Sequence, residues 1–203
     1  IQGPNSDDEK TKKKFMKNLN DQSSRMENLI NDLLILARIE LEEHIRPTKT
    51  VSINKIFEEI ISNFEIVLKK KKITIKKKIL ENSTVLGDEK KLNTVFSNLL
   101  DNAIKYSPEN KNIYITNKEN DGKLIEKSMM ISIRDEGVGI PQKYIPRVTE
   151  RFFRVDIEQS NKTGGTGLGL AIMKHIVTQH RGDFEILSKE NNGTEIKIFL
   201  PSN

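Results

Sequence analysis

The stretch NLLDNAIKY, residues 98–106, divides a predicted helix into an apolar face and a polar face. Since each residue of a helix turns about 100° from the one before it, Asn98, Asn102 and Lys105 fall within an arc of roughly 60°. The core side of the same helix holds apolar residues, namely Leu92, Phe96, Leu99, Leu100 and Ala103. An amide oxygen can ligate magnesium without adding charge, and a lysine beside it can neutralise phosphate oxygens. The polar stripe therefore suits a magnesium-triphosphate ligand, although a solvated helix face would show the same pattern.

A second polar stretch, DEGVGIP at residues 135–141, directly follows a predicted strand. An aspartate at a strand end, here Asp135, can accept a hydrogen bond from an exocyclic amine such as that of adenine. Gly137 and Gly139 allow the backbone to approach a flat ring closely. Taken alone, the stretch is also explained as a plain exit from a strand into a turn.

A third stretch, GGTGLGL at residues 164–170, leads into a helix with Leu168, Ile172 and Ile176 on one face. Its glycines let backbone N–H groups face an anion, and the start of the helix adds a partial positive charge of about +0.5. The spacing is not that of a Walker loop or a dinucleotide fingerprint, because no Gly-Lys-Ser/Thr follows and a polar loop precedes it. The pattern predicts a phosphate cradle of another kind.

Between the second and third stretches lie ERFFRVD, residues 150–156, and then the polar segment 157–163. Phe152 and Phe153 are suited to anchor a mobile lid, which we expect to span residues 155–166. Arg151 or Arg154 is then free to meet phosphate oxygens.

The surrounding chain alternates between strands and helices after Pro47. Period-two and helical patterns predict strands at 50–53, 73–79, 112–117, 129–134, 183–188 and 195–200, and helices at 54–69, 89–106 and 167–180. The last two strands are joined by Asn191-Asn192-Gly193, a hairpin signal. This alternation predicts an α/β unit that follows the N-terminal region.

The N-terminal region carries a heptad pattern of alternating four- and three-residue spacings. Its positions are Phe15, Leu19, Gln22, Met26, Leu29, Leu33, Leu36 and Glu40. Asp7 and Asp8 favour a helix start and Arg46-Pro47 a stop, which gives a helix of roughly 35 residues, about 50 Å long. Packing on the core of its own domain is the simpler interpretation, but the length of the seam favours dimerisation.

Composition excludes several classes of protein. The chain has 203 residues, a formal net charge of +5 and no cysteine, so disulfides, thiolate metal sites and cysteine nucleophiles are excluded. No stretch reaches the roughly 18 apolar residues of a membrane helix. The lysine runs at 69–72 and 76–78 flank a β-like 73–75, which favours a solvated edge strand over a nucleic-acid or lipid site. We therefore expect no nucleic-acid partner.

In this order and spacing, the blocks resemble the N, G1, F and G2 boxes of sensor histidine kinases, within the ATPase superfamily of gyrase, heat-shock chaperones and mismatch-repair proteins. The resemblance implies an α+β fold: a two-layer α/β sandwich of the Bergerat type, its mixed sheet covered by helices on one face, after a long coiled-coil-like helix. It implies a partial dimerisation domain at 1–46, with the second helix only, and an ATP-binding catalytic domain at 47–203. Residues 147–156 and 170–176 look like the phosphate-regulon sensor branch.

By that resemblance Asn102 is the magnesium ligand, Asn98 its neighbour, Lys105 a phosphate contact and Tyr106 a ring on the adenine side. Asp135 would select adenine. The other residues that the resemblance assigns to ATP are Gly137, Gly139, Ile140, Phe152, Arg154, Gly165, Thr166, Gly167, Leu168, Gly169, Leu170 and Thr194. Within this set, Arg154 would assist at the phosphates and Thr194 would support Asp135.

The resemblance also implies a reaction, the transfer of the ATP γ-phosphate to a histidine and then to a response regulator. Hydrolysing relatives carry a glutamate where this chain has Asn98, and an amide cannot take a proton from water. The acceptor motif does not occur here, and His44, His175 and His180 lack the neighbouring carboxylate that would activate them. We expect the cytoplasmic part of a homodimeric parent, anchored in the bacterial inner membrane by segments outside this chain. An ATP-hydrolysing clamp and a non-catalytic interaction module are the alternatives.

Overall fold

The structure is a computed structural model that describes residues 6–42, 44–120, 127–155 and 165–202. Its helices are α1 (Ser6–Leu41), α2 (Ile53–Lys71), α3 (Glu89–Tyr106) and α5 (Gly169–Gln179), with a short 3-10 helix, η1 (Gln142–Arg147). Its strands are β1 (Thr50–Ser52), β2 (Thr74–Lys78), β3 (Thr84–Leu86), β4 (Asn112–Asn120), β5 (Ser128–Asp135), β6 (Asp183–Ser188) and β7 (Thr194–Pro201). In the described part of the chain, no helix combines the length and the apolar character that crossing a membrane requires.

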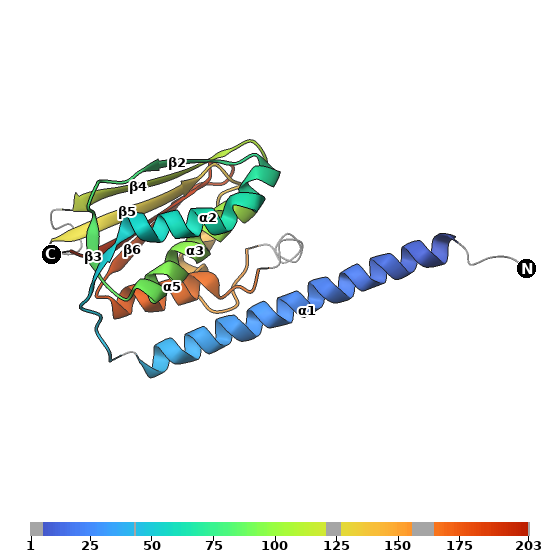
Figure 1. The fold of residues 1–203 in the computed structure, drawn as a ribbon, viewed down its shortest axis with the longest axis horizontal. Helices are drawn as coiled ribbons and strands as arrows, with labels where there is room; N and C mark the ends of the chain where they lie inside the picture. The colour runs from blue at the N-terminus through green and yellow to red at the C-terminus, as the bar shows by residue number, and fades with distance from the viewer. Residues whose placement is uncertain (1–5, 43, 121–126, 156–164, 203) are drawn as a thin grey trace, which may run out of the picture.

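Five strands form one mixed sheet in the order β2-β4-β5-β7-β6, with β2 and β4 parallel and the other pairs antiparallel. Helices α2, α3 and α5 lie against one face of this sheet (Figure 1). The core forms between the layers, where the rings of Phe57 and Phe96 lie 4.9 Å apart. Ile113 and Ile115 of β4 are fully buried, as the period of two requires of the inward face. The predicted two-layer sandwich with a mixed sheet is confirmed.

Strand β2 lies at one edge of the sheet, and its lysines are mostly solvated. Lys77 pairs at 3.6 Å with Glu58 of α2. Charged side chains on an edge strand oppose pairing with a further strand, because the incoming strand would have to desolvate them. The prediction of an edge strand between the lysine runs is confirmed.

Two elements were not predicted. Strand β3 pairs with β1 in a separate two-stranded sheet, with Val51 opposite Val85. It has only three residues, so no alternation marks it. Helix η1 contains Pro146, which normally argues against a helix but is tolerated in one short turn.

Helix α1 divides its heptad seam between two environments. Its C-terminal part lies beside α5, while the N-terminal part projects away from the domain (Figure 1). Leu36 and the nearby Ile39 are only 3% and 4% exposed, and Leu29 packs against the same core. In contrast, Phe15 and Met26 of the seam are 60% and 64% exposed. The end of the seam thus packs on its own domain, and the part before Leu29 is exposed in the described structure.

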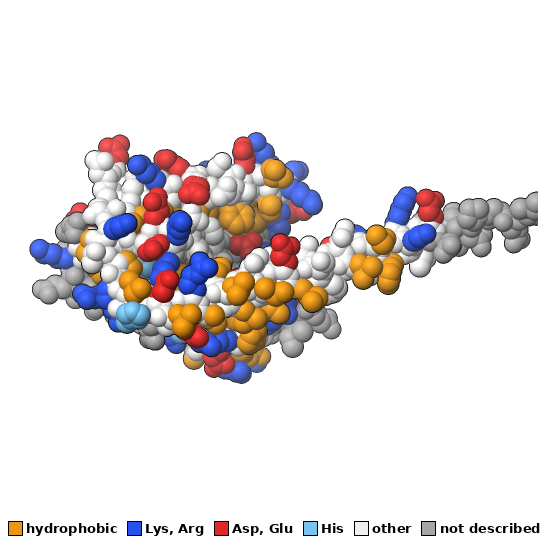
Figure 2. Space-filling model, turned by 60° about the horizontal axis from the view of Figure 1, so that its bottom comes forward, with side chains coloured by type: hydrophobic (Ala, Val, Ile, Leu, Met, Phe, Trp, Pro, Cys, Tyr) orange, Lys and Arg blue, Asp and Glu red, His pale blue; other side chains and the backbone are white. Residues whose placement is uncertain are grey.

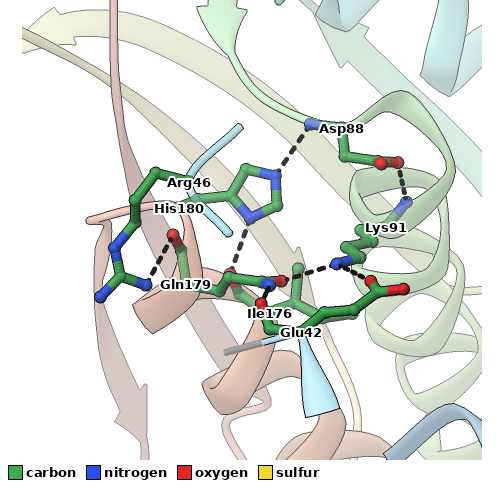
Figure 3. Close-up of polar contacts among 7 residues, drawn as sticks. All are labelled: Glu42, Arg46, Asp88, Lys91, Ile176, Gln179 and His180. Atoms are coloured by element: carbon green, nitrogen blue, oxygen red, sulfur yellow. Dashed lines mark hydrogen bonds and ion pairs between the residues drawn. The ribbon is translucent and has the colours of Figure 1, made fainter. Parts of the chain in front are cut away.

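A polar cluster fixes the end of α1 to the domain, and Figure 3 shows its members converging from α1, α3 and α5. The Lys91 ammonium donates to the Glu42 carboxylate at 2.7 Å and to the Gln179 amide oxygen at 3.0 Å. The Gln179 amide donates in turn to the carbonyl oxygen of Glu42. Since Glu42 directly follows α1, these bonds set the path of the chain between the helix and β1.

His180 completes this cluster as a buried, neutral imidazole. Its Nε2 accepts the backbone N–H of Asp88 at 2.9 Å, so its Nδ1 carries the hydrogen and donates to the carbonyl oxygen of Ile176 at 2.8 Å. Burial lowers the pKa of His180, an effect that Lys91 reinforces and that the Ile176 bond and Asp88 oppose. The side chain predicted to be structural therefore holds α5 to the loop before α3.

We expect the stability of the protein to fall as the pH drops below about 6.5, the ordinary pKa of histidine. The unfolded His180 takes up a proton there, whereas the folded one stays neutral to lower pH because its pKa is lowered. Urea unfolding at pH 7.5 and 5.5 measures the effect, and His180→Gln is expected to have a smaller difference between the two pH values. An equal difference in both proteins would show that His180 contributes nothing to it.

Candidate nucleotide-binding site

A cavity of about 460 Å³ opens between α3, the turn after β5, the start of α5, β7 and α1. Most residues that the sequence assigned to a nucleotide line it: Asn98, Asn102, Lys105, Tyr106, Asp135, Gly139, Ile140, Arg154, Gly165, Thr166, Gly167, Gly169, Leu170 and Thr194. They come from segments separated by up to 96 positions, 98 to 194, and the fold brings them to one place. The volume lies in the usual range of small-molecule sites.

The polar stripe of α3 faces the cavity, because the opposite side of the helix is buried in the core. The amide of Asn98 donates at 3.5 Å to the carbonyl oxygen of Gly169, which links α3 to the first residue of α5. Lys105 is paired at 2.5 Å with Asp101, one helical turn before it. Asp101 was not predicted, and it holds the ammonium in place within the cavity.

Asp135 ends β5 and presents its carboxylate to the cavity. Its Oδ1 accepts the backbone N–H of Gly137 at 2.8 Å and that of Thr194 at 3.1 Å. Burial raises the pKa of Asp135, while these two bonds lower it. Since both bonds go to Oδ1, the other oxygen, Oδ2, is the one that a ligand would use. Thr194 supports Asp135 through its backbone, and its hydroxyl instead meets that of Ser188 at 2.8 Å.

Two glycines beside the cavity have backbone conformations and contacts that exclude a side chain. Gly139 has φ +69°, and a Cβ there would lie 2.1 Å from the carbonyl oxygen of Lys189. Gly193 has φ +81°, and its Cβ would lie 2.1 Å from the carbonyl oxygen of Asp135. These close approaches pack the β6–β7 turn against the turn that follows β5.

Replacing Gly193 by alanine is expected to destabilise the fold by about 2 kcal/mol or more, since the strain and the clash both fall on backbone. For a chain of this size that lowers the melting temperature by roughly 6 °C. Gly165→Ala is the matched control, because among the described residues a Cβ there meets nothing closer than the Tyr106 hydroxyl at 3.9 Å. Equal melting temperatures for the two variants would contradict the packing described.

Arg154 lines the cavity with donors that have no partner in the described part of the chain. Its Nε and Nη2 are buried and make no hydrogen bond there. Buried guanidinium nitrogens without an acceptor are costly, so these two donors are suited to an anionic ligand. With Lys105 and the N-terminus of α5 on the same cavity wall, the residues present fit a polyphosphate.

Three predicted residues do not line the cavity. Leu168 is fully buried in the core and packs under the cradle. Phe152 is 55% exposed with φ +63°, and Phe153 lines the cavity in its place. Gly137 lies against Tyr106, since a Cβ would meet that residue's carbonyl oxygen at 2.6 Å. Of the predicted lid, 155–166, residues 156–164 lie outside the described residues.

The contribution of α1, which lines the cavity with Asn28 and Asp32, was not predicted. The Thr166 hydroxyl donates to Asp32 Oδ2 at 2.6 Å across 134 positions of sequence. Burial raises the pKa of Asp32, while the Thr166 bond lowers it. The apolar part of the lining, which includes Ile133, Val138 and Ile196, was likewise not predicted.

Comparisons with known proteins identify the family of this chain. The sequence profile of the family described as histidine kinase-, DNA gyrase B- and HSP90-like ATPase matches residues 87–203. The phosphate regulon sensor protein PhoR of Pseudomonas aeruginosa is 35% identical over 179 residues, which are 88% of this chain and 39% of that protein. The sensor-like histidine kinase SenX3 of Mycolicibacterium smegmatis is 34% identical over 195 residues, 96% of this chain and 50% of that protein.

Solved structures of histidine kinases are similar to this chain in fold. The mycobacterial sensor histidine kinase MprB has a TM-score of 0.62 at 30% identity, covering 76% of this chain and 97% of that one. The catalytic domain of the histidine kinase ThkA has a TM-score of 0.63 at 26% identity, covering 75% and 94%. PhoR and SenX3 are almost equally similar, so the phosphate-regulon branch stays a prediction. The chain belongs to the histidine kinase-, DNA gyrase B- and HSP90-like ATPase family, and within that family it carries a histidine kinase catalytic domain.

Proposed function

We propose that the cavity binds magnesium-ATP and that the domain transfers the γ-phosphate to a histidine, from which a response regulator receives it. The observation that carries the proposal is the convergence of three groups on one cavity: the Asp135 carboxylate, the amide stripe of α3 and the glycine-rich start of α5. The chain spans half or less of the length of the curated relatives described above. The activity and partners of the whole protein are therefore part of this proposal.

Adenine recognition is assigned to Asp135. Its Oδ2 would accept the exocyclic amine, while the N–H groups of Gly137 and Thr194 hold Oδ1 in a fixed orientation. A guanine base presents a carbonyl oxygen at the corresponding position, and two acceptors facing each other repel. Tyr106 and Ile140 supply ring and aliphatic surface beside the base.

Phosphate binding is assigned to Lys105, Arg154 and the backbone N–H groups at the start of α5. Lys105 would exchange its bond to Asp101 for phosphate oxygens, and Arg154 would satisfy its buried donors. Asn102, with Asn98 beside it, is the residue that would hold magnesium through its amide oxygen. When bound, the metal supplies positive charge that neutralises the phosphate oxygens.

The carboxylates of the cavity favour transfer over hydrolysis. Activation of water needs a free general base. Among the described residues that line the cavity, Asp101 is paired with Lys105 and Asp32 accepts the Thr166 hydroxyl. Asp135 binds two backbone N–H groups through Oδ1, and its Oδ2 is assigned to adenine. Asn98 lies where hydrolysing relatives carry glutamate, and an amide cannot act as a base.

Transfer is tested by supplying the acceptor separately. The chain is incubated with magnesium and γ-labelled ATP, together with a full-length parent protein whose own site is disabled by Asn102→Ala. The proposal predicts label on that protein that is stable to base and released by acid, as a phosphohistidine is. Absence of labelled protein, with inorganic phosphate released by the isolated chain at about 1 per second or faster, would instead support the hydrolysing alternative.

Dimerisation through α1 is the second part of the proposal. Phe15, Leu19, Met26 and Leu33 are exposed along the helix, and Figure 2 shows hydrophobic side chains gathered on its surface. An apolar stripe of this length needs a partner. A further bundle helix of the parent protein, together with a second copy of the protein, would cover it. We place the boundary between the dimerisation part, 1–46, and the catalytic part, 47–203, at Arg46-Pro47. The parent protein is proposed to lie in the inner membrane, with this chain on the cytoplasmic side.

A further inference from the structure

Helix α1, through which we propose dimerisation, contributes a carboxylate to the cavity. Asp32 of α1 lines the cavity and accepts the hydroxyl hydrogen of Thr166 at 2.6 Å. The Thr166 oxygen in turn accepts the backbone N–H of Leu168 at 3.2 Å, at the start of α5. The negative charge of Asp32 is thereby linked to the N-terminus of α5.

The position of Asp32 is set by the docking of the whole C-terminal part of α1. Leu36 and Ile39 are buried against the domain. Glu40 forms an ion pair with Arg151, and the next residue after the helix, Glu42, pairs with Lys91 at 2.7 Å. Asp32 lies two helical turns before Glu40, so these contacts and the Thr166 bond fix one face of α1 at successive points.

Two of the groups around Asp32, Lys105 and the start of α5, are groups assigned to the phosphates. Thr166, the start of α5 and Lys105 all line the cavity, and Lys105 attracts the Asp32 carboxylate electrostatically. Two anions that share one cradle repel each other, and the repulsion is strong where water is excluded. A nucleotide polyphosphate and the docked Asp32 therefore compete for the same donors.

We propose that Asp32 acts as a resident anion in the phosphate cradle, so that docking of α1 and binding of a nucleoside triphosphate oppose each other. The inference rests on the proposed function, because it assigns the cradle to phosphates. The opposition is reciprocal: the docked helix weakens nucleotide binding, and bound nucleotide releases the Asp32–Thr166 contact and loosens α1.

Calorimetric titration with a non-hydrolysable ATP analogue and magnesium tests whether the docked helix weakens nucleotide binding. Asp32→Asn removes the charge and keeps the shape, and it is expected to bind about tenfold more tightly than the original chain, a change of about 1.4 kcal/mol. Asp21→Asn is the matched control, since Asp21 lies three turns earlier on the same side of α1 and is exposed. Its affinity is expected to be unchanged.

The outcomes separate the inference from the proposed function. If the original chain binds no analogue, the nucleotide site is refuted and the inference falls with it. If the original chain binds but Asp32→Asn binds equally or more weakly, the site stands and the opposition is refuted.

A distance measurement tests whether bound nucleotide loosens α1. The chain has no cysteine, so spin labels attach only at introduced ones, and exposed Lys17 of α1 and Lys174 of α5 are suitable sites. In Lys17→Cys/Lys174→Cys, the analogue with magnesium is expected to lengthen or broaden the distance distribution between the labels. An identical distribution with and without the analogue, at saturating concentration, would overturn the release of α1.

Discussion

Asn102→Ala is expected to abolish magnesium-dependent ATP binding, weakening it by about 100-fold or more. The amide of Asn102 lies on the cavity face of α3, between Asn98 and Lys105. Alanine is the strongest helix former, so the helix and the fold should persist while the proposed metal ligand is lost. Titration with the ATP analogue, with and without magnesium, measures the loss.

Asn93→Ala is the control for this variant. Asn93 lies on the same helix, accepts a hydrogen bond from Ser97 at 3.2 Å and does not line the cavity. Its affinity for the analogue should match that of the unchanged chain. Tight magnesium-dependent binding by Asn102→Ala would remove Asn102 from the site and with it the assigned metal position.

Asp135→Asn is expected to weaken ATP binding by roughly 100-fold and to reduce the preference for ATP over GTP. The substitution replaces a carboxylate by an amide, which donates as well as accepts, at a half-buried position. An unmatched polar group that becomes buried under a ligand costs about 1–3 kcal/mol. The substitution also weakens the hydrogen bonds that Oδ1 of Asp135 accepts from the N–H groups of Gly137 and Thr194. Competition of ATP and GTP for the site measures both effects.

Glu136→Gln is the control beside it. Glu136 is the next residue, but its carboxylate accepts the backbone N–H of Asn112 and the hydroxyl of Tyr114, both at 3.0 Å, outside the cavity. We expect its nucleotide affinity to stay within twofold of the original. If Asp135→Asn retained the affinity and the selectivity of the unchanged chain, another residue would have to recognise the base.

Local periodicity was sufficient to predict the faces of α3. Each residue of the stripe turns by a fixed angle, so the sequence of the helix alone places Asn102 and Lys105 on one side and Phe96 on the other. Strand β4 was predicted for the same reason, since its residues alternate between buried and less buried over most of its length. By contrast, β3 is too short to carry a period, and its pairing with β1 depends on tertiary structure.

The parts of the site that were not predicted depend on contacts between distant residues. The support of Asp135 by Thr194 was predicted, but no side-chain pattern reveals that it comes from a backbone N–H 59 positions away. Phe152 and Phe153 are adjacent, and no side-chain pattern tells that Phe152, with its positive φ, is exposed while Phe153 lines the cavity. The contact of Asp32 with Thr166 arises because α1 folds back onto the domain.

The heptad of α1 was predicted correctly as a helix, but its pattern cannot tell which partner each position meets. Leu36 belongs to the same seam as Phe15, yet Leu36 is buried against its own domain and Phe15 is exposed. Both kinds of contact require apolar residues at helical spacing, so only the tertiary structure separates them.

Titration calorimetry of this chain with a non-hydrolysable ATP analogue, with and without magnesium, tests the central claim most directly. The account predicts saturable binding at one site per chain that strengthens when magnesium is present. No heat of binding under either condition, from a chain whose unfolding is cooperative, would contradict the claim that the cavity between α3 and α5 is a nucleotide site.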